Sequence, residues 1–176
     1  MNIFVLSRDV DKAARALADV HVVKMTLETT QLLCTAIRYL VPDMPEDNLY
    51  RETHSNHPCT IWARSSPANY MWLLRYGFAL CEEYTLRYGR VHKCQSVLSL
   101  LPVFKCDEEP SSFALAMPDG FKHSNPVTAY RRYYRLSKAM NIKRFTYTNR
   151  KPPAWLTCAT SAPQKPGESL EQTSKV

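Results

Sequence analysis

Three side chains with acid–base or nucleophilic chemistry follow one another at helical spacing: His21, Lys24 and Glu28. If residues 20–40 form one helix, the three fall within a wedge of about 60°. A glutamate in a partly enclosed basic site can act as a general acid or base, or stabilise a cationic transition state. A lysine there can bind phosphate or act as an amine nucleophile. The alternative is an exposed Lys–Glu pair that stabilises the helix by about 0.3 kcal/mol.

A second group of polar and aromatic residues lies between His54 and Trp72. Asn56, His57 and Arg64 are candidate binding residues in it. They lie in a polar connection and near the start of a helix, where free backbone N–H groups favour anions. The sequence therefore predicts a second polar patch that is suited to phosphate.

Histidines and cysteines are present, but their spacing does not predict a metal centre. His54, His57 and Cys59, or His92 and Cys94, match no common structural zinc pattern. The six cysteines stand singly, without CxxC pairs, as is typical of reduced thiols. We expect no metal and no other cofactor.

The positive charge of the chain is concentrated in residues 121–151. This segment holds nine basic residues and no acidic one, whereas the whole chain carries a net charge of +7. Lys and Arg neutralise phosphates, and interleaved aromatic side chains can stack on bases, so the segment predicts a DNA-binding surface. Plain solubility is the alternative. The candidate phosphate ligands are Arg131, Arg132, Arg135 and Lys138.

A helix over residues 127–140 would sort this segment into two stripes. Tyr130, Tyr133, Tyr134 and Ser137 have the spacing of a buried stripe. A second stripe, turned away from it, consists of Arg131, Arg135 and Lys138. The tyrosines are therefore expected in the core and the cations at the surface.

The elements that must position these groups are predicted to be helices. With 4 glycines in 176 residues, the chain is poorly supplied for the tight turns of an all-β fold. The length suits one domain. We predict an all-α fold, a compact single-domain helical bundle over residues 1–156, with a short extended segment at the N-terminus and a disordered tail over residues 157–176.

Local signals place the individual helices. Residues 20–40 read as one long helix that buries the face carrying Val20, Val23, Leu27, Cys34 and Val41. Ser66-Pro67 is a good helix start, and Gly89 a good stop. We expect further helices after Ser7 or Asp9 and over residues 92–101, a strand or an extended arm over residues 3–6, and irregular chain over residues 102–125.

The chain shows no membrane-spanning run and no secretory signal. We therefore expect no membrane partner and a cytoplasmic location, which for a viral protein is the host cytoplasm. A monomer is expected.

The segment from Leu17 to Glu28, the triplet Asn56-His57-Pro58 with Trp62, and the run from Leu80 to Tyr84 resemble the pyrimidine-dimer DNA glycosylase (phage endonuclease V-like) superfamily. They also resemble a group of small proteins of phages and large viruses. The resemblance covers residues 1–92, with a looser one over residues 126–138. It implies a compact all-α fold that acts on duplex DNA without a metal.

The resemblance also implies roles for particular residues. Glu28 matches the family's catalytic glutamate and His21 its helix histidine, while Lys24, Asn56 and His57 match residues of the bacterial branch. In the family, the glutamate and an N-terminal α-amine excise a damaged pyrimidine through a Schiff base. An extruded nucleotide needs aromatic walls. The candidates for these walls are Tyr70, Trp62 and Trp72.

The sequence departs from the phage enzyme at its first residues. Asn2 is bulky and should keep Met1 in place, so the amine nucleophile is Met1, Lys24 or absent. We predict a base-excision N-glycosylase for damaged or modified pyrimidines in DNA, with or without AP-lyase activity. The alternatives are a non-catalytic nucleic-acid-binding viral protein and an enzyme that acts on a modified nucleotide or base outside duplex DNA.

Overall fold

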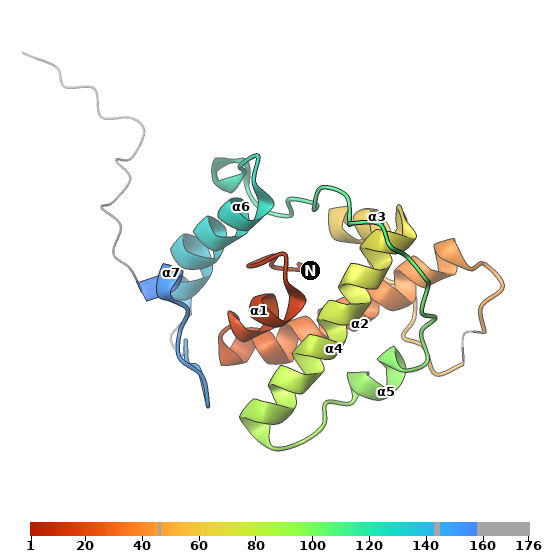
Figure 1. Cartoon of the computed structure of the whole chain (residues 1–176), viewed down its shortest axis with the longest axis horizontal. Helices are drawn as coiled ribbons and strands as arrows, with labels where there is room; N and C mark the ends of the chain where they lie inside the picture. The colour runs from red at the N-terminus through yellow and green to blue at the C-terminus, as the bar shows by residue number, and fades with distance from the viewer. Residues whose placement is uncertain (46, 143–144, 158–176) are drawn as a thin grey trace, which may run out of the picture.

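Two long helices that cross each other form the centre of the structure, a computed structural model that describes residues 1–45, 47–142 and 145–157. They are α2 (Asp19–Leu40) and α4 (Pro67–Tyr88), and Figure 1 shows the other elements arranged around them. Within the described ranges the chain contains helices and no strand, so the predicted all-α fold is confirmed. None of these helices is long and apolar enough to cross a membrane.

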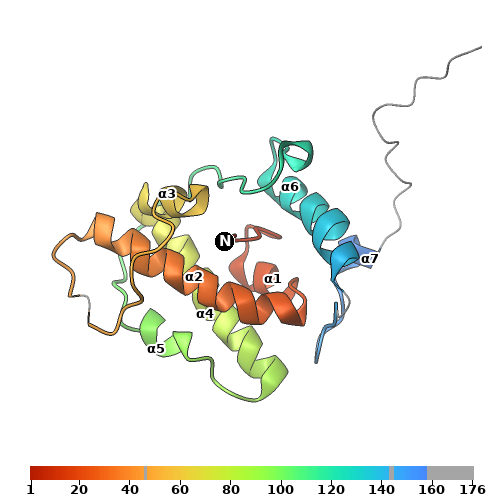
Figure 2. The same ribbon diagram turned by 180° about the vertical axis from the view of Figure 1, so that it is seen from behind.

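The shorter helices pack against this pair or form a separate arm. They are α1 (Val10–Arg15), α3 (Pro58–Arg64), α5 (Cys94–Leu98), the 3₁₀ turn η1 (Asp119–Phe121), α6 (Pro126–Tyr133) and α7 (Ala154–Thr157). A π-helix, η2 (Tyr134–Ala139), continues α6 directly. Figure 2, the view from behind, shows that α6 and α7 lie to one side of the crossed pair.

Side-chain caps explain where several helices begin and end. The Ser66 hydroxyl accepts a hydrogen bond from the Asn69 N–H at the start of α4, and Gly89 ends the helix at a φ of 67°. Both boundaries were predicted from the sequence, and both are confirmed. Asp9 caps α1, and Asn125 caps α6 in the same way.

Other boundaries differ from the prediction. Of the two alternatives expected for residues 3–6, a strand or an extended arm, the structure has the arm, and Phe4 there has a positive φ of 32°. The helix expected over residues 92–101 covers only Cys94–Leu98. Residues 157–176 were predicted to form a disordered tail. Thr157 belongs to α7, and residues 158–176 lie outside the described residues.

The prediction of which face of α2 is buried was wrong. Val20, Val23 and Leu27 are 42%, 41% and 41% exposed, although Cys34 is buried. Val23 and Leu27 instead line an open groove of about 490 Å³ together with residues of α4 and of the 90–94 stretch. The buried face holds Val22, Met25, Leu32, Leu33 and Ile37, with threonines between them.

Hydrogen bonds made by threonine side chains explain why the buried face of α2 differs from the expected one. The hydroxyls of Thr26 and Thr30 donate to the carbonyl oxygens of Val22 and Thr26, one turn earlier, at 2.7 and 2.8 Å. A threonine whose hydroxyl is satisfied by its own helix can pack as an apolar side chain. The spacing of aliphatic residues alone therefore misplaces the face.

The N-terminal arm is buried in the middle of the fold. Ile3, Val5 and Leu6 are 0% exposed. The Asn2 side chain holds the start of the arm: its Oδ1 accepts from the N–H groups of Ile3 and Phe4, and its Nδ2 donates to the Ala116 carbonyl at 2.8 Å. These bonds fix the first residues of the chain against a segment more than a hundred positions away.

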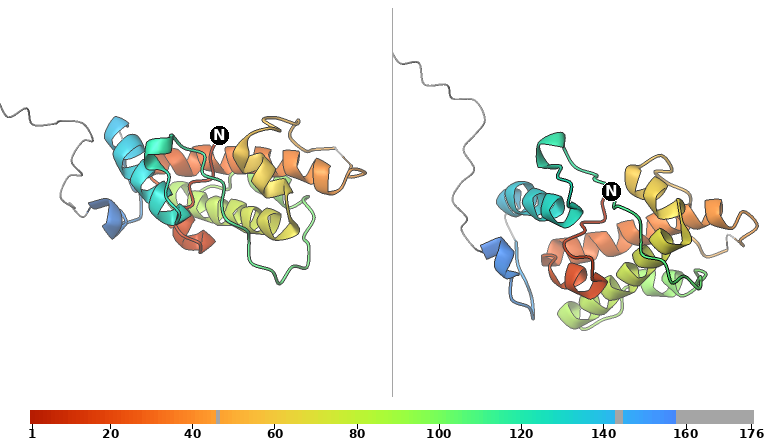
Figure 3. Two further views of the ribbon diagram at one scale, coloured as in Figure 1. Left: turned by 90° about the horizontal axis from the view of Figure 1, so that it is seen from above. Right: turned by 45° about the horizontal axis from the view of Figure 1, so that its top comes forward.

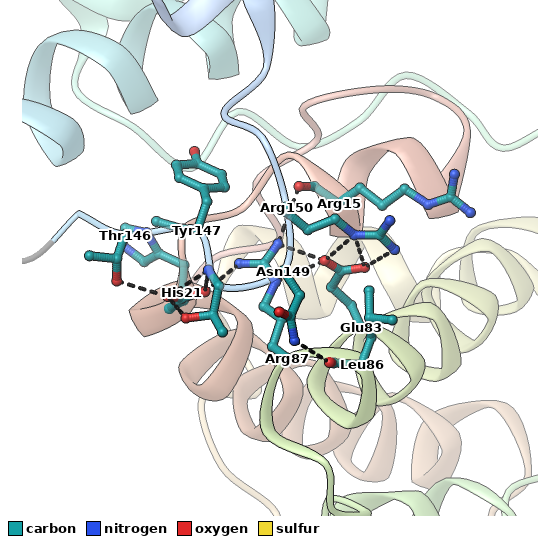
Figure 4. Close-up of polar contacts among 12 residues, drawn as sticks. Arg15, His21, Glu83, Leu86, Arg87, Thr146, Tyr147, Asn149 and Arg150 are labelled. Atoms are coloured by element: carbon teal, nitrogen blue, oxygen red, sulfur yellow. Dashed lines mark hydrogen bonds and ion pairs between the residues drawn. The ribbon is translucent and has the colours of Figure 1, made fainter.

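Residues 146–150 are fastened to the crossed helices by buried charges (Figure 4). Arg87, 4% exposed, pairs with Asp19 at 2.9 Å and with Glu83 at 2.7 Å. Arg150 pairs with Glu83 at 2.8 Å, and the Thr148 N–H donates to Asp19. The network thus connects α2, α4 and the C-terminal segment.

This network also lowers the pKa of its two carboxyls. Burial alone would raise the pKa of Asp19 and of Glu83, but hydrogen bonds from Thr146 and Thr148 to Asp19, and from Arg150 and Arg87 to Glu83, outweigh it. A depressed carboxyl pKa stabilises the fold above the unfolded-state value near 4. We expect this stabilisation to disappear as the pH falls through the lower folded-state values.

Replacing Arg87 by Met should lower the free energy of unfolding by about 3–5 kcal/mol, because it leaves two buried carboxylates without their central partner. Urea unfolding at neutral pH measures the change. Lys12→Met is the matched control: it breaks an exposed pair with Asp9 at 3.7 Å, and its effect should stay below about 1 kcal/mol. An Arg87→Met variant no less stable than this control would contradict the assignment.

Candidate active site

A cavity of about 250 Å³ opens where the N-terminal arm meets α2 and the π-helix. Figure 3 shows the N-terminus above α2, between α3 and the α6–η2 arm. The cavity is lined by Met1, Asn2, Phe4, His21, Lys24, Met25, Glu28, Ala116, Tyr133 and Lys138. It therefore contains all three side chains, His21, Lys24 and Glu28, that the sequence predicted on one side of this helix.

Glu28 is held between two nitrogen groups. Its Oε2 accepts a hydrogen bond from the Asn2 N–H at 3.0 Å, and its Oε1 lies 3.6 Å from the Lys24 Nζ. The Glu28 side chain is 14% exposed and that of Lys24 63%. The carboxylate is thus fixed at the cavity wall, whereas the Lys24 side chain is largely exposed to solvent.

His21 is buried, with only 5% of the residue exposed, behind the N-terminal arm. Its Nδ1 lies 2.7 Å from the Tyr134 hydroxyl, and its ring centroid is 5.3 Å from that of Phe4. Burial, and then the positive charges of Lys138 and Lys24, lower its pKa to about 4. The imidazole is therefore neutral at physiological pH.

His57 reaches the same place from α3. Its Nδ1 accepts from the Cys59 N–H at 3.2 Å and so caps the helix. Burial lowers its pKa, as do the charges of the Met1 amine and His54, while Glu28 and a hydrogen bond with the Met1 backbone act in the opposite direction. His57 is therefore an immediate neighbour of Met1 without lining the cavity wall.

Several predicted binding residues lie elsewhere. Asn56 is exposed and does not line the cavity. Arg64 stacks on Tyr39, with its guanidinium carbon 3.9 Å from the ring centroid. Tyr70 and Trp72 are 0% and 3% exposed within the core.

The aromatic residues that line the cavity are not the three candidates Tyr70, Trp62 and Trp72. The Trp62 and Trp72 rings pack on each other at 6.0 Å, and Trp72 donates its indole N–H to the Arg8 carbonyl. The cavity is bordered instead by Phe4 and Tyr133, whose rings stack at 6.2 Å. Sequence reasoning missed Phe4, because no local pattern indicates that the arm enters the site.

The predicted cationic stripe divides into two parts. The Lys138 ammonium lies 5.0 Å from the Tyr133 ring centroid and lines the cavity. Arg131 donates its Nε–H to the Leu6 carbonyl at 2.8 Å and faces Trp155. The π-helix explains the difference, because its wider turn shifts later residues away from α-helical phase. Arg132 is exposed and Arg135 half-buried.

The described residues hold no group of three or more His, Cys, Asp or Glu side chains that could bind a metal ion. The chemistry available in the cavity is that of one carboxylate (Glu28), three amines (Met1, Lys24 and Lys138) and the neutral imidazole of His21. Such a set can attack an electrophilic carbon and stabilise the positive charge that develops there.

The first part of the chain, residues 1–96, matches the family model of the pyrimidine dimer DNA glycosylases. No curated protein matches the chain. No solved structure does either. The chain belongs to the pyrimidine dimer DNA glycosylase family, which confirms the resemblance seen in the sequence and makes DNA the substrate class at family level.

Part of the cavity wall lies outside the residues that match the family model. Ala116, Tyr133 and Lys138 line the cavity but follow residue 96. They are brought in by the α6–η2 arm and the segment that precedes it. The cavity therefore combines family-matched residues with a wall outside the match.

An NMR titration should give His21 a pKa of about 4. The sign follows from burial: the folded protein resists protonation, so His21 stabilises the fold above about pH 6.5, and this contribution is lost as the pH falls toward 4. Lys138→Met should raise the pKa of His21, because it removes a nearby positive charge. A midpoint at or above 6.5 would contradict this environment.

Proposed function

We propose that the chain is a DNA N-glycosylase that removes a damaged or modified pyrimidine with the α-amine of Met1 and then cleaves the strand as an AP lyase. One observation carries the proposal: the hydrogen bond from the Asn2 N–H to Glu28 at 3.0 Å brings the first residue of the chain to a carboxylate in a cationic cavity. Family membership supports the glycosylase class.

In the glycosylase step, the amine nitrogen forms a bond to C1′ as the C1′–N1 bond breaks. The pyrimidine leaves with that electron pair and takes up a proton. C1′ carries positive charge while this happens, and the Glu28 carboxylate stabilises it. The nitrogen then loses one proton, its lone pair forms the C1′=N bond as the C1′–O4′ bond breaks, and O4′ takes up a proton, which gives the protonated imine.

In the lyase step, a base removes one proton from C2′ and the electrons move toward the iminium carbon. The 3′ C–O bond breaks, and the phosphate leaves with its electron pair. Water then hydrolyses the imine and frees the amine. We assign Glu28 as this base, because it lines the same cavity as Met1 and accepts a hydrogen bond from the next residue, Asn2.

Met1 is favoured over Lys24 as the nucleophile by position. Met1 lines the cavity, its neighbour Asn2 donates to Glu28, and its backbone forms a hydrogen bond with His57. Lys24, 63% exposed, is better suited to bind a phosphate at the mouth of the cavity. Phe4 and Tyr133 would contact an extruded base.

Borohydride should trap a covalent complex between the protein and duplex DNA that carries an abasic site, a pyrimidine dimer or a modified pyrimidine. We expect mass mapping to place the adduct on Met1. Glu28→Gln should reduce base release by at least about a hundredfold, because the developing positive charge loses its counter-charge. The matched control is Glu82→Gln, an exposed glutamate on α4.

The outcomes separate the alternatives. Mapping to Lys24 would keep the imine mechanism and overturn the choice of amine. Base release without trapping would indicate a glycosylase that uses water. Salt-sensitive DNA binding that is unaffected by Glu28→Gln, with no base release, would favour a binding module.

Lys138→Gln should weaken binding to duplex DNA uniformly across sequences and reduce the slope of log Kd against log salt by about one, because each phosphate contact releases counterions. Binding titrations at several salt concentrations measure this. Lys105→Gln is the control: Lys105 is exposed and lies just before the acidic run at residues 107–109. Equal slopes for the two variants would show that the cavity does not face the DNA backbone.

A further inference from the structure

The Tyr134 hydroxyl makes two contacts in the interior. It accepts a hydrogen bond from the Ala18 N–H at 2.9 Å and lies 2.7 Å from the Nδ1 of His21. Tyr134 is 0% exposed, so water cannot replace either partner. Ala18 is the N-cap residue of α2 and has no side-chain cap of its own, so one hydroxyl serves both the helix end and the histidine.

Counting hydrogens fixes the direction of the second bond. A tyrosine hydroxyl has one hydrogen to donate, and here one of its lone pairs is taken by the Ala18 N–H. Within the described part of the chain, His21 Nδ1 is the acceptor within reach of that hydrogen. If Nδ1 carried a proton instead, the buried hydroxyl hydrogen would have no partner, which is unfavourable.

We propose that Tyr134 is a positioning residue that locks His21 in the tautomer with the proton on Nε2, so that the ring presents a fixed N–H donor to the cavity. His21 then cannot accept a proton at Nε2 from the substrate or from water. Its partner is an acceptor on the departing pyrimidine, whose carbonyl oxygens gain negative charge as the C1′–N1 bond breaks. This catalytic part rests on the proposed function, and the tautomer itself does not.

The surroundings of His21 favour a neutral donor. The ring lies in the first turn of α2, where the helix dipole disfavours a cation. The charged groups that line the cavity with it are Lys24 and Glu28 on the same helix, Lys138 on the π-helix, and the Met1 amine. A neutral imidazole with a fixed donor can stabilise developing negative charge without adding a further positive charge.

The ring ¹⁵N spectrum of the unmodified protein tests the tautomer without any substrate. We expect His21 to show a protonated Nε2 and an unprotonated, hydrogen-bonded Nδ1 at neutral pH. A protonated Nδ1 would overturn the proposal whether or not the protein releases a base. A glycosylase assay that failed while the Nε2–H tautomer was observed would count against the proposed function alone.

Tyr134→Phe removes the hydroxyl and keeps the ring. We expect the His21 signals to become those of a mixture of tautomers, and kcat for base release to fall by about tenfold or more with a nearly unchanged KM. Tyr147→Phe is the matched control, because the Tyr147 hydroxyl bonds the Ala16 carbonyl at 3.1 Å and does not touch His21. It should change neither the spectrum nor kcat.

Two results with Tyr134→Phe would overturn the positioning role. One is a folded variant whose His21 keeps a single Nε2–H tautomer. The other is a folded variant in which His21 shows a mixture of tautomers while kcat for base release equals that of the unmodified protein. The thermal unfolding midpoint of each variant shows that it is folded, and the spectrum of the unmodified protein decides the tautomer even if Tyr134→Phe does not fold.

Discussion

The hydrogen bonds of the buried Asn2 side chain place the first residue of the chain beside Glu28. Oδ1 accepts two backbone N–H groups of the arm, and Nδ2 binds the Ala116 carbonyl. With the side chain used in this way, the Asn2 N–H points to Glu28. A chain end loses conformational entropy when it is fixed, so such precision requires a buried anchor. The arm supplies that anchor, since Ile3 to Leu6 lie in the core.

The sequence predicted the side of α2 that lines the cavity, because that side depends on helical periodicity. His21, Lys24 and Glu28 share one side of the helix by spacing alone, and the cap at Ser66 and the stop at Gly89 are local signals. The part that it failed to predict depends on tertiary contacts. Neither the entry of Phe4 into the site nor the exposure of Val23 and Leu27 has a local signature.

The π-helix is a second feature that spacing could not predict. A regular helix over residues 127–140 would align Arg131, Arg135 and Lys138. The wider turns from Tyr134 onward instead direct Lys138 to the cavity. Arg131 lies against the N-terminal arm, where it binds the Leu6 carbonyl. The same segment buries Tyr134 against His21. An irregular helix therefore completes the site, and π-helical turns are frequent at functional sites.

Charge balance links these features to the chemistry. The cavity gathers the Met1 amine, Lys24 and Lys138 against the single carboxylate of Glu28. A protonated His21 would add a fourth positive charge in a buried place, and its pKa of about 4 shows how strongly the surroundings oppose this. The excess positive charge is suited to the phosphates of DNA, which would neutralise it on binding. In the proposed reaction, Glu28 would be the one carboxylate of the cavity that faces the cationic sugar.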